Sequence, residues 1–208
     1  NFLASWGEDI LKDAHGIYID ADDNVYCTER ENHCVFKFDR NGKLLMTLGT
    51  PGVQSEQDGD PFRLPTDLAI ASTGDLYISD GYGNRRVVVL DADTGKFKRM
   101  WGAYGKMPDD SYPRYRVYTP VQQQFNLLHG MAISLDGTVY VADRNANRVQ
   151  AFTLDGKFIN EGLVAPGSPM TGNGSAFGVA FSGDSEQRFL YIADGHNQKI
   201  RVLDRKSL

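Results

Sequence analysis

The chain has 208 residues, of which 41% are hydrophobic and 24% are charged, a composition typical of one folded globular domain rather than of a disordered segment. Its 22 Lys and Arg residues against 27 Asp and Glu residues give a net charge of -5, without the basic cluster that a nucleic-acid backbone attracts. The acidic net charge therefore gives no reason to expect nucleic-acid binding. The apolar runs fall far short of the roughly 20 residues that a membrane-spanning helix needs, so no membrane span is expected.

Four copies of one pattern follow one another along the chain, at residues 14–50, 64–102, 127–161 and 175–205. Each copy opens with an apolar strand such as HGIYID at 15–20, and a second strand such as NVYCTE at 24–29 follows after a turn. A third strand comes after a short polar loop, and in three copies a Gly-Lys turn leads to a fourth strand. Four antiparallel strands repeated in this way predict an all-β fold, a β-propeller with one blade per copy in a single domain, residues 1–208.

Residues 1–7 precede the first copy and end in Trp-Gly, as the fourth strand of the second copy does at Trp101-Gly102. They are therefore predicted to form the outer strand of a preceding blade. Two arrangements are open: residues 1–7 complete the last copy and close a four-bladed ring, or the four copies are an incomplete piece of a larger ring. Four blades is the lower limit for propellers, and we favour the second arrangement, although an open ring leaves unpaired strand edges.

Two cysteines, Cys27 and Cys34, flank residues 28–33, between the second and third predicted strands of the first copy, and could face each other across this hairpin. Residues that face each other across a hairpin are close enough for a disulfide. Two separate thiols that pack as small apolar side chains fit the sequence equally well, so both possibilities are open.

Propeller geometry places the first residue of each innermost strand around one mouth of the central channel. These residues are His15, Thr66, His129 and Phe177. The loops between the second and third strands lie at the same mouth and contribute Arg30, Gly81-Tyr82, Arg144-Asn145 and Gly195-His196. Two histidines at equivalent positions are candidate zinc ligands, although a histidine at a strand start is also compatible with a structural role.

The pair Asn32-His33 before a hydrophobic strand, together with the repeated strand pattern, resembles the NHL repeat, which usually builds six-bladed propellers. Several segments further resemble the peptidyl-α-hydroxyglycine α-amidating lyase family (peptidylamidoglycolate lyase), an NHL propeller that uses zinc to cleave a carbinolamide to a peptide amide and glyoxylate. These segments are residues 14–17, 64–69, 78–86, 128–132 and 141–150.

The resemblance implies that His15 and His129 are two of three zinc ligands, that Tyr82 is the catalytic tyrosine and that Arg144 is an active-site arginine. It also implies a structural calcium ion bound in part by the backbone near Ile17, and a secreted or periplasmic protein. The third histidine, a second arginine and the acidic calcium ligand would belong to blades outside these 208 residues. The site in this chain is therefore expected to be incomplete.

Four further residues are expected at the rim of the substrate site: Arg86, Asn145, His196 and Tyr115. For Arg86 a solvated position or a pair with an acidic strand end is also open, and for His196 a solvated position in its loop. Tyr115 lies in the long insertion 103–124, whose tyrosines and arginines either grip an acidic or peptide-like ligand or cover the channel.

The chemistry of a carbinolamide suits these residue types, because its hydroxyl must lose a proton as the C–N bond breaks. A zinc ion favours that loss, a tyrosine takes the proton, and a guanidinium fits the carboxylate of the substrate. The leading prediction is a carbon-nitrogen lyase acting on a small molecule or peptide that ends in α-hydroxyglycine. The alternatives are an NHL propeller that binds a peptide or protein without chemistry, and a calcium-dependent lactonase-like hydrolase, against which the two ring histidines count.

Overall fold

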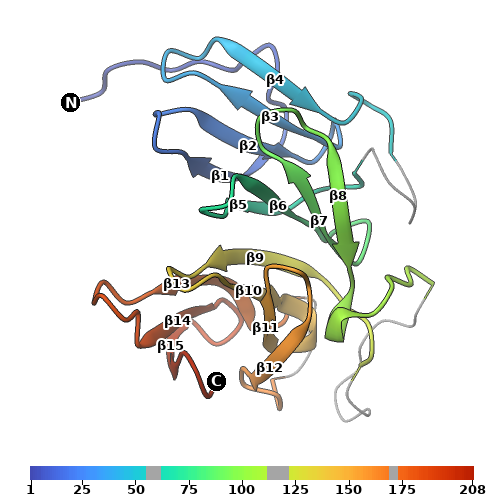
Figure 1. Ribbon diagram of the computed structural model, residues 1–208, viewed down its shortest axis with the longest axis vertical. Coiled ribbons are helices and arrows are strands. Elements are labelled where there is room, and N and C mark those ends of the chain that lie inside the picture. Colours follow the sequence, from blue (N-terminus) through green and yellow to red (C-terminus); the bar gives the residue numbers. More distant parts are fainter. Residues whose placement is uncertain (55–61, 112–121, 169–172) are drawn as a thin grey trace.

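The computed structural model describes residues 1–54, 62–111, 122–168 and 173–208, and these form four antiparallel sheets, one for each copy of the repeat (Figure 1). Blade 1 contains β1 (Ala14–Ile19), β2 (Val25–Glu29), β3 (Cys34–Phe38) and β4 (Leu44–Leu48). Blade 2 contains β5 (Asp67–Ile70), β6 (Asp75–Asp80), β7 (Arg86–Asp91) and β8 (Phe97–Trp101). Blade 3 contains β9 (Leu128–Ile133), β10 (Thr138–Asp143), β11 (Arg148–Thr153) and β12 (Phe158–Leu163), and blade 4 contains β13 (Ala176–Phe181), β14 (Phe189–Asp194) and β15 (Lys199–Asp204).

The predicted all-β propeller is confirmed. Helical structure in the described residues is limited to two short 3-10 turns, η1 (Ala103–Gly105) and η2 (Arg144–Ala146). None of the helices in the described ranges has the length and apolar character needed to cross a membrane.

The turn between the first two strands of each blade requires one residue in the left-handed region of backbone conformation. Gly74 and Gly137 fill this position in blades 2 and 3, with φ of 79° and 77°. Asp23 and Gln187 fill it in blades 1 and 4, with φ of 61° and 49°. Glycine adopts this conformation without steric cost, which explains its recurrence in the repeat.

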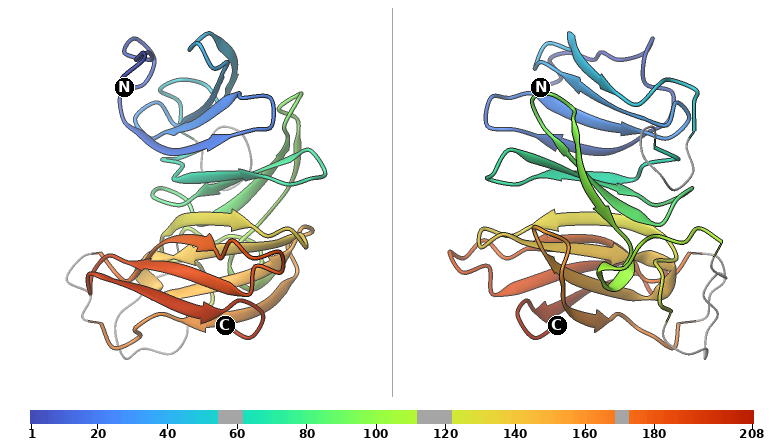
Figure 2. Two further views of the ribbon diagram at one scale, coloured as in Figure 1. Left: turned by 90° about the vertical axis from the view of Figure 1, so that its left-hand side faces the viewer. Right: turned by 45° about the vertical axis from the view of Figure 1, so that its right-hand side comes forward.

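Among the described residues, three of the four hydrophobic clusters lie between neighbouring blades, and the fourth lies on blade 1, where Trp6 and Leu11 pack against a cluster that includes Phe36 and Phe38. Tyr26 and Leu76 belong to the cluster between blades 1 and 2, Trp101 and Val139 to the cluster between blades 2 and 3, and Leu190 to the cluster between blades 3 and 4. The innermost strands β1, β5, β9 and β13 follow one another side by side (Figure 2). Each blade therefore needs a neighbour to bury its apolar face, as in other repeat proteins.

Residues 1–7 form no strand, unlike the outer strand expected for them: none of the four sheets of the described residues includes them, and β15 remains the edge of blade 4. Their tryptophan still takes a position typical of a fourth strand. Trp6 packs on Phe38 and covers Gly42, as Trp101 at the end of β8 covers Gly156 of the next blade. The assignment of residues 1–7 to a preceding blade remains a prediction.

The outward faces of the two end blades carry exposed apolar side chains. Ile17 and Ile19 of β1 are 68% and 59% exposed, and Ile200 and Val202 of β15 are 67% and 56% exposed. A propeller blade normally buries such residues against its neighbour. The larger ring remains a prediction that these two faces support.

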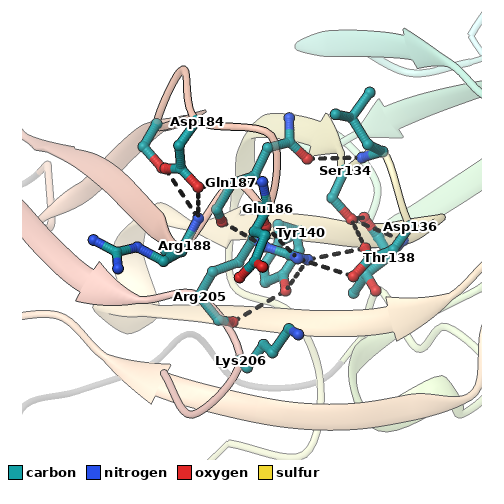
Figure 3. Close-up of polar contacts among 12 residues, drawn as sticks. Ser134, Asp136, Thr138, Tyr140, Asp184, Glu186, Gln187, Arg188, Arg205 and Lys206 are labelled. Carbon is teal, nitrogen blue, oxygen red and sulfur yellow. Dashed lines mark hydrogen bonds and ion pairs between the residues drawn. The ribbon is translucent and has the colours of Figure 1, made fainter.

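Blades 3 and 4 are joined on the face opposite the predicted site, around Arg205 (Figure 3). The guanidinium donates to both carboxylate oxygens of Asp136 at 2.9 Å and to the carbonyl of Gln187 at 2.7 Å. Tyr140 donates its hydroxyl to the carbonyl of Arg205 at 3.0 Å, as Tyr77 does to a carbonyl of the blade after its own. The hydrogen bond from Arg205 lowers the pKa of Asp136 to about 2. These contacts tie blade 3 to blade 4 on this face.

Cys27 and Cys34 are both buried and free, so of the two possibilities the structure contains two separate thiols. Cys34 lies opposite Glu29 in the β2–β3 pairing, whereas Cys27 lies opposite Phe36. The cysteines are thus diagonal neighbours, and diagonal positions in a sheet are about 7–8 Å apart, too far for a disulfide. Burial raises the pKa of the Cys27 thiol to about 11.

Candidate functional site

His15 and His129 come from alternate blades and meet at one mouth of the channel, with 4.8 Å between their ring centroids. The Nδ1 of His15 donates to the carbonyl of Thr66 at 2.6 Å, and the Nδ1 of His129 donates to the carbonyl of Phe177 at 2.7 Å. Since a carbonyl can only accept, each Nδ1 carries the proton and each Nε2 keeps a lone pair. This is the orientation that a metal-binding histidine has when a backbone carbonyl holds its other nitrogen.

The residue after each histidine explains how the ring reaches the next blade. A Cβ atom on Gly16 would lie 2.6 Å from the carbonyl oxygen of Thr66, and one on Gly130 would lie 2.8 Å from that of Phe177. Only glycine therefore allows the neighbouring innermost strands to approach so closely. The glycine after each histidine thus allows the neighbouring blade to come close enough for the hydrogen bond that the histidine donates to it.

Both imidazoles are neutral at physiological pH. Burial, together with a smaller effect of the nearby Arg144 guanidinium, lowers the pKa of His129 to about 4. Burial also lowers the pKa of His15, with an additional contribution from the Arg30 guanidinium. A neutral imidazole is the form that binds a metal ion.

We expect the side-chain nitrogens of His129 to titrate near pH 4 rather than near pH 6.5. The unfolded chain takes up this proton first, so His129 reduces the free energy of unfolding as the pH falls from about 6.5 to about 4. Nitrogen-15 NMR of the imidazoles between pH 3.5 and 8 measures this, with the loop residue His196 followed in the same spectra. A midpoint for His129 above pH 6 would contradict the buried geometry.

Tyr82 lies against both histidines, with ring centroids 5.4 Å from His15 and 5.8 Å from His129 in edge-to-face geometry. Arg144 donates from Nη1 to the phenol oxygen at 3.1 Å. Asp143, the sequence neighbour of Arg144, instead pairs with Arg148 at 3.0 Å, so Arg144 is not held in a salt bridge with it. The two residues assigned to catalysis from the sequence are thus in direct contact beside the histidine pair.

Arg30 was expected at the channel mouth from its loop position, but the sequence assigned it no role in the site. Its guanidinium lies 4.8 Å from the centre of the Tyr82 ring, and its Nη2 pairs with Asp13 at 2.6 Å. Its buried Nε has no hydrogen-bond partner among the described residues. A signal was present, because Arg30 follows the acidic end of β2 directly, as Arg144 follows Asp143 at the end of β10.

Asp67 begins the innermost strand of blade 2, at the position that is glycine in the other three blades. Its Oδ2 accepts the backbone N–H of Met131 at 2.8 Å, and its Oδ1 accepts that of Leu68 at 2.9 Å. Burial raises the pKa of Asp67 to about 6. The carboxylate joins blades 2 and 3 and so helps to fix the strand that carries His129.

A polar pocket of about 340 Å³ opens beside Tyr82 and Arg144, between the β6–β7 loop and the loop that precedes β9. Asn145, one of the predicted rim residues, lines it and accepts a hydrogen bond from Arg144 Nε at 3.2 Å. The pocket is large enough for one or two amino-acid residues of a ligand.

The other predicted site residues lie elsewhere. Arg86 is wrong as a rim residue: it is fully buried, and its Nε pairs with Asp80 at 2.9 Å. The physical reason is an ion pair between the acidic last residue of the second strand and an arginine near the start of the third strand. The same pair forms in blade 4 between Asp194 and Arg201. His196 is half-buried in the β14–β15 loop and does not line the pocket. Tyr115 lies outside the described residues.

The candidate metal site has two histidines. Within the described ranges there is no group of three His, Cys, Asp or Glu side chains that could hold a metal ion. Ile17, expected to contribute a calcium ligand through its carbonyl, lies in β1 opposite Cys27, with its side chain exposed. Both the zinc ion and the calcium ion remain predictions.

Comparison with known proteins agrees with this architecture. The family model described as "NHL repeat" matches residues 11–38, 62–90 and 125–152. The peptidylglycine α-amidating monooxygenase of Rattus norvegicus is 37% identical over 76% of this chain and 16% of its own length. A probable peptidyl-α-hydroxyglycine α-amidating lyase of Caenorhabditis elegans is 28% identical over 96% of this chain, and NHL repeat-containing protein 3 of Homo sapiens is 29% identical over 97%.

The chain spans 53% and 55% of the length of the nematode and human relatives. Among solved structures, virginiamycin B lyase from Staphylococcus aureus superposes with a TM-score of 0.60 at 16% identity, over 94% of this chain and 54% of that one. A streptogramin B lyase superposes with a TM-score of 0.62 at 16% identity, over 94% of this chain and 52% of that one. At this identity the two structures show the propeller fold alone.

The strand pattern, the sheets and the repeat matches agree, and the sequence similarity extends over nearly all of the chain. This chain is a β-propeller that contains NHL repeats, and its homologues include proteins named peptidyl-α-hydroxyglycine α-amidating lyases.

Proposed function

We propose that this chain supplies part of the active site of a zinc-dependent lyase that splits an α-hydroxyglycine carbinolamide into an amide and glyoxylate. The observation that carries the proposal is the meeting of His15, His129, Tyr82 and Arg144 at one mouth of the channel. The sequence similarity to amidating lyases supports it, and the reaction belongs to the whole protein rather than to this chain alone.

The two histidines fit a zinc ion as two of its ligands. Their Nδ1 atoms are held by backbone carbonyls, burial keeps the rings neutral, and zinc binds imidazole nitrogen readily. A catalytic zinc has three protein ligands, so we propose that the third comes from a blade outside these 208 residues. The ion, when bound, would act as a Lewis acid on the substrate hydroxyl. The calcium ion near Ile17 stays a prediction.

The residues of this chain account for the remaining steps. Tyr82 takes the proton of the substrate hydroxyl, the oxygen electrons form the aldehyde of glyoxylate, and the C–N bond breaks. The departing nitrogen receives this proton back from Tyr82 and becomes the amide, so Tyr82 returns to its starting state and neither water nor a redox partner is needed. The N–H that Arg144 donates to the phenol oxygen stabilises negative charge there while Tyr82 acts as a base. Arg30 and Arg144 both place guanidinium groups beside Tyr82, where they would attract the substrate carboxylate.

The test is metal content together with glyoxylate release in the longest available form of the gene. His15→Ala and His129→Ala are each expected to lose bound zinc and to lower turnover by more than about 100-fold. Loss of a residue that only hydrogen-bonds to a metal ligand already costs up to about 100-fold in metal affinity or activity, and loss of the ligand itself costs at least as much. His196→Ala is the matched control and should retain both. Unchanged zinc content and turnover in the two ring variants would remove the lyase assignment.

A second candidate function is peptide or protein binding without chemistry. It is favoured by the two-histidine site in the described residues and by the similarity to NHL repeat-containing protein 3. Wild-type protein without zinc and without glyoxylate release would support this function and exclude the first.

A further inference from the structure

Side chains at the channel mouth form a series of hydrogen bonds that runs from each blade to the next. His15 of blade 1 donates to the carbonyl of Thr66 in blade 2 at 2.6 Å, and His129 of blade 3 donates to the carbonyl of Phe177 in blade 4 at 2.7 Å. Thr66 makes the link between blades 2 and 3, because its hydroxyl donates to the carbonyl of Leu128 at 3.0 Å. All three bonds point in the same direction around the mouth, and the middle one comes from a threonine.

Thr66 is connected to both histidines. Its carbonyl oxygen accepts the Nδ1–H of His15 and, at 3.0 Å, the hydroxyl hydrogen of Thr28 in blade 1. Its hydroxyl holds the carbonyl of Leu128, the residue directly before His129. Thr66 is fully buried, so bulk water does not compete for these bonds. The backbone of Thr66 is therefore coupled to the first histidine, and its side chain is coupled to the second.

The single hydrogen of the Thr66 hydroxyl has two carbonyl oxygens within reach. The carbonyl of Ser79 lies at 2.8 Å, but it already accepts the backbone N–H of Thr66 at 2.8 Å. The Ser79 hydroxyl lies 2.7 Å from Thr66 Oγ1 and can donate to it. With this donor in place, the hydrogen of the Thr66 hydroxyl is available for Leu128, and the hydroxyl joins blade 2 to blade 3.

Blade 2 holds the backbone on both sides of His129. Thr66 holds the carbonyl of Leu128 directly before it, and Asp67 accepts the backbone N–H of Met131, two residues after it, at 2.8 Å. Two hydrogen bonds to one short stretch of chain fix its rotation as well as its position. Without the Thr66 bond one of the two remains, and the peptide before His129 can turn.

We propose that Thr66 is a positioning residue for the two histidines, and that its hydroxyl sets the distance and the angle between the imidazole rings. The inference rests on the proposed zinc site, because the separation of the rings decides whether both Nε2 atoms reach one ion. Zinc binds imidazole nitrogen at about 2.0–2.1 Å, so two such nitrogens cannot lie more than about 4 Å apart.

Thr66→Val removes the hydroxyl and little else. Valine keeps the β-branched shape of threonine, and the backbone carbonyl that holds His15 is retained. The Ser79 hydroxyl has another acceptor in the carbonyl of Asp67 at 3.1 Å. The carbonyl of Leu128 loses the Thr66 donor, so the effect of the substitution is expected at His129.

The distance between the imidazole rings is measurable without metal and without turnover. With 4.8 Å between ring centroids, the ring protons of His15 and His129 should give a nuclear Overhauser effect (NOE) in the metal-free protein. We expect Thr66→Val to weaken this NOE by about 2-fold or more, because a buried carbonyl that loses its donor shifts toward another partner. Thr66→Ser keeps the hydroxyl and should restore the NOE.

Tyr77→Phe is the matched control. It removes a hydroxyl-to-carbonyl hydrogen bond between the same two blades, from Tyr77 to Leu154 at 3.1 Å, at the end of the strands opposite the mouth. This variant should leave the NOE unchanged. Thermal unfolding of each variant shows whether it folds, and Thr66→Ala, which removes the same hydroxyl, replaces Thr66→Val if the valine variant does not fold.

Zinc affinity, measured by competition with a chelator in the longest available form of the gene, is the second readout. Thr66→Val is expected to weaken it by about 10-fold, the lower end of the cost of losing a residue that supports a metal ligand, and Thr66→Ser and Tyr77→Phe by less than about 3-fold. A wild type that binds no zinc, with an NOE that weakens in Thr66→Val alone, would overturn the proposed lyase function and support the role of Thr66. An NOE that is absent from the wild type, survives in Thr66→Val or falls equally in Tyr77→Phe would overturn the inference, as would zinc affinity that Thr66→Val leaves unchanged.

Discussion

Replacing Tyr82 by phenylalanine is expected to lower kcat for an α-hydroxyglycine substrate by about 10² to 10⁴-fold, the contribution typical of a general base. The substitution removes the oxygen to which Arg144 donates and which lies beside the histidine pair. The ring itself remains, so its contacts with His15, His129 and the Arg30 guanidinium are retained. Glyoxylate release under saturating substrate measures the effect.

Zinc content separates a catalytic role from a structural one in this variant. The Tyr82→Phe protein should bind as much zinc as the wild type, because the phenol oxygen is not one of the proposed ligands. Tyr191→Phe, at a partly exposed position of β14, is the matched control and should leave kcat unchanged. A Tyr82→Phe protein with full zinc content and a kcat within about 3-fold of the wild type would show that the proton goes to another group.

Replacing Arg148 by methionine is expected to lower the free energy of unfolding by about 3–5 kcal/mol, because it leaves a buried carboxylate without its counter-ion. Arg148 is 1% exposed and pairs with Asp143 at 3.0 Å. It also donates at 2.9 Å to the carbonyls of Gln122 and Gln124, in the segment that leads to β9. For a chain of this size the loss corresponds to a fall in Tm of about 6–20 °C.

The same substitution should also affect the functional site. Asp143 accepts the backbone N–H groups of Asn126 and Leu127 at 2.9 Å, and these residues lead directly to His129. Arg40→Met, an exposed position of the β3–β4 turn, is the control for the loss of one positive charge. Thermal and urea unfolding measure both variants. A fall in Tm for Arg148→Met no larger than that of the control would mean that the buried carboxylate finds another partner.

The repeat made the innermost strands and the ring of residues at their start predictable. Alternating apolar residues, a left-handed turn residue and an acidic second-strand end recur in each copy, and these features act within about 20 neighbouring residues. Once the copies were aligned, propeller geometry placed His15 and His129 at the same mouth, and the structure confirms that they meet there.

The sequence pattern did not predict the different positions of the two arginines that follow second strands. Arg86 and Arg144 both follow such an acidic end, yet Arg86 is buried in an ion pair with Asp80, whereas Arg144 donates to Tyr82. Arg86 begins the third strand of its blade, directly opposite Asp80, whereas Arg144 belongs to the loop before the third strand. A shift of a few residues decides between the two positions, and a sequence pattern does not resolve that shift.

The sequence by itself determined the blades, their order and the residues around the channel mouth, because local strand and turn preferences recur in register four times. Only the tertiary structure decided which side chains become partners across blades: Arg30 over Tyr82, and Asp67 with the backbone of Met131. Such contacts join residues tens of positions apart. They depend on the spacing and tilt of neighbouring sheets, which the packing of the cores between blades sets and no local pattern encodes.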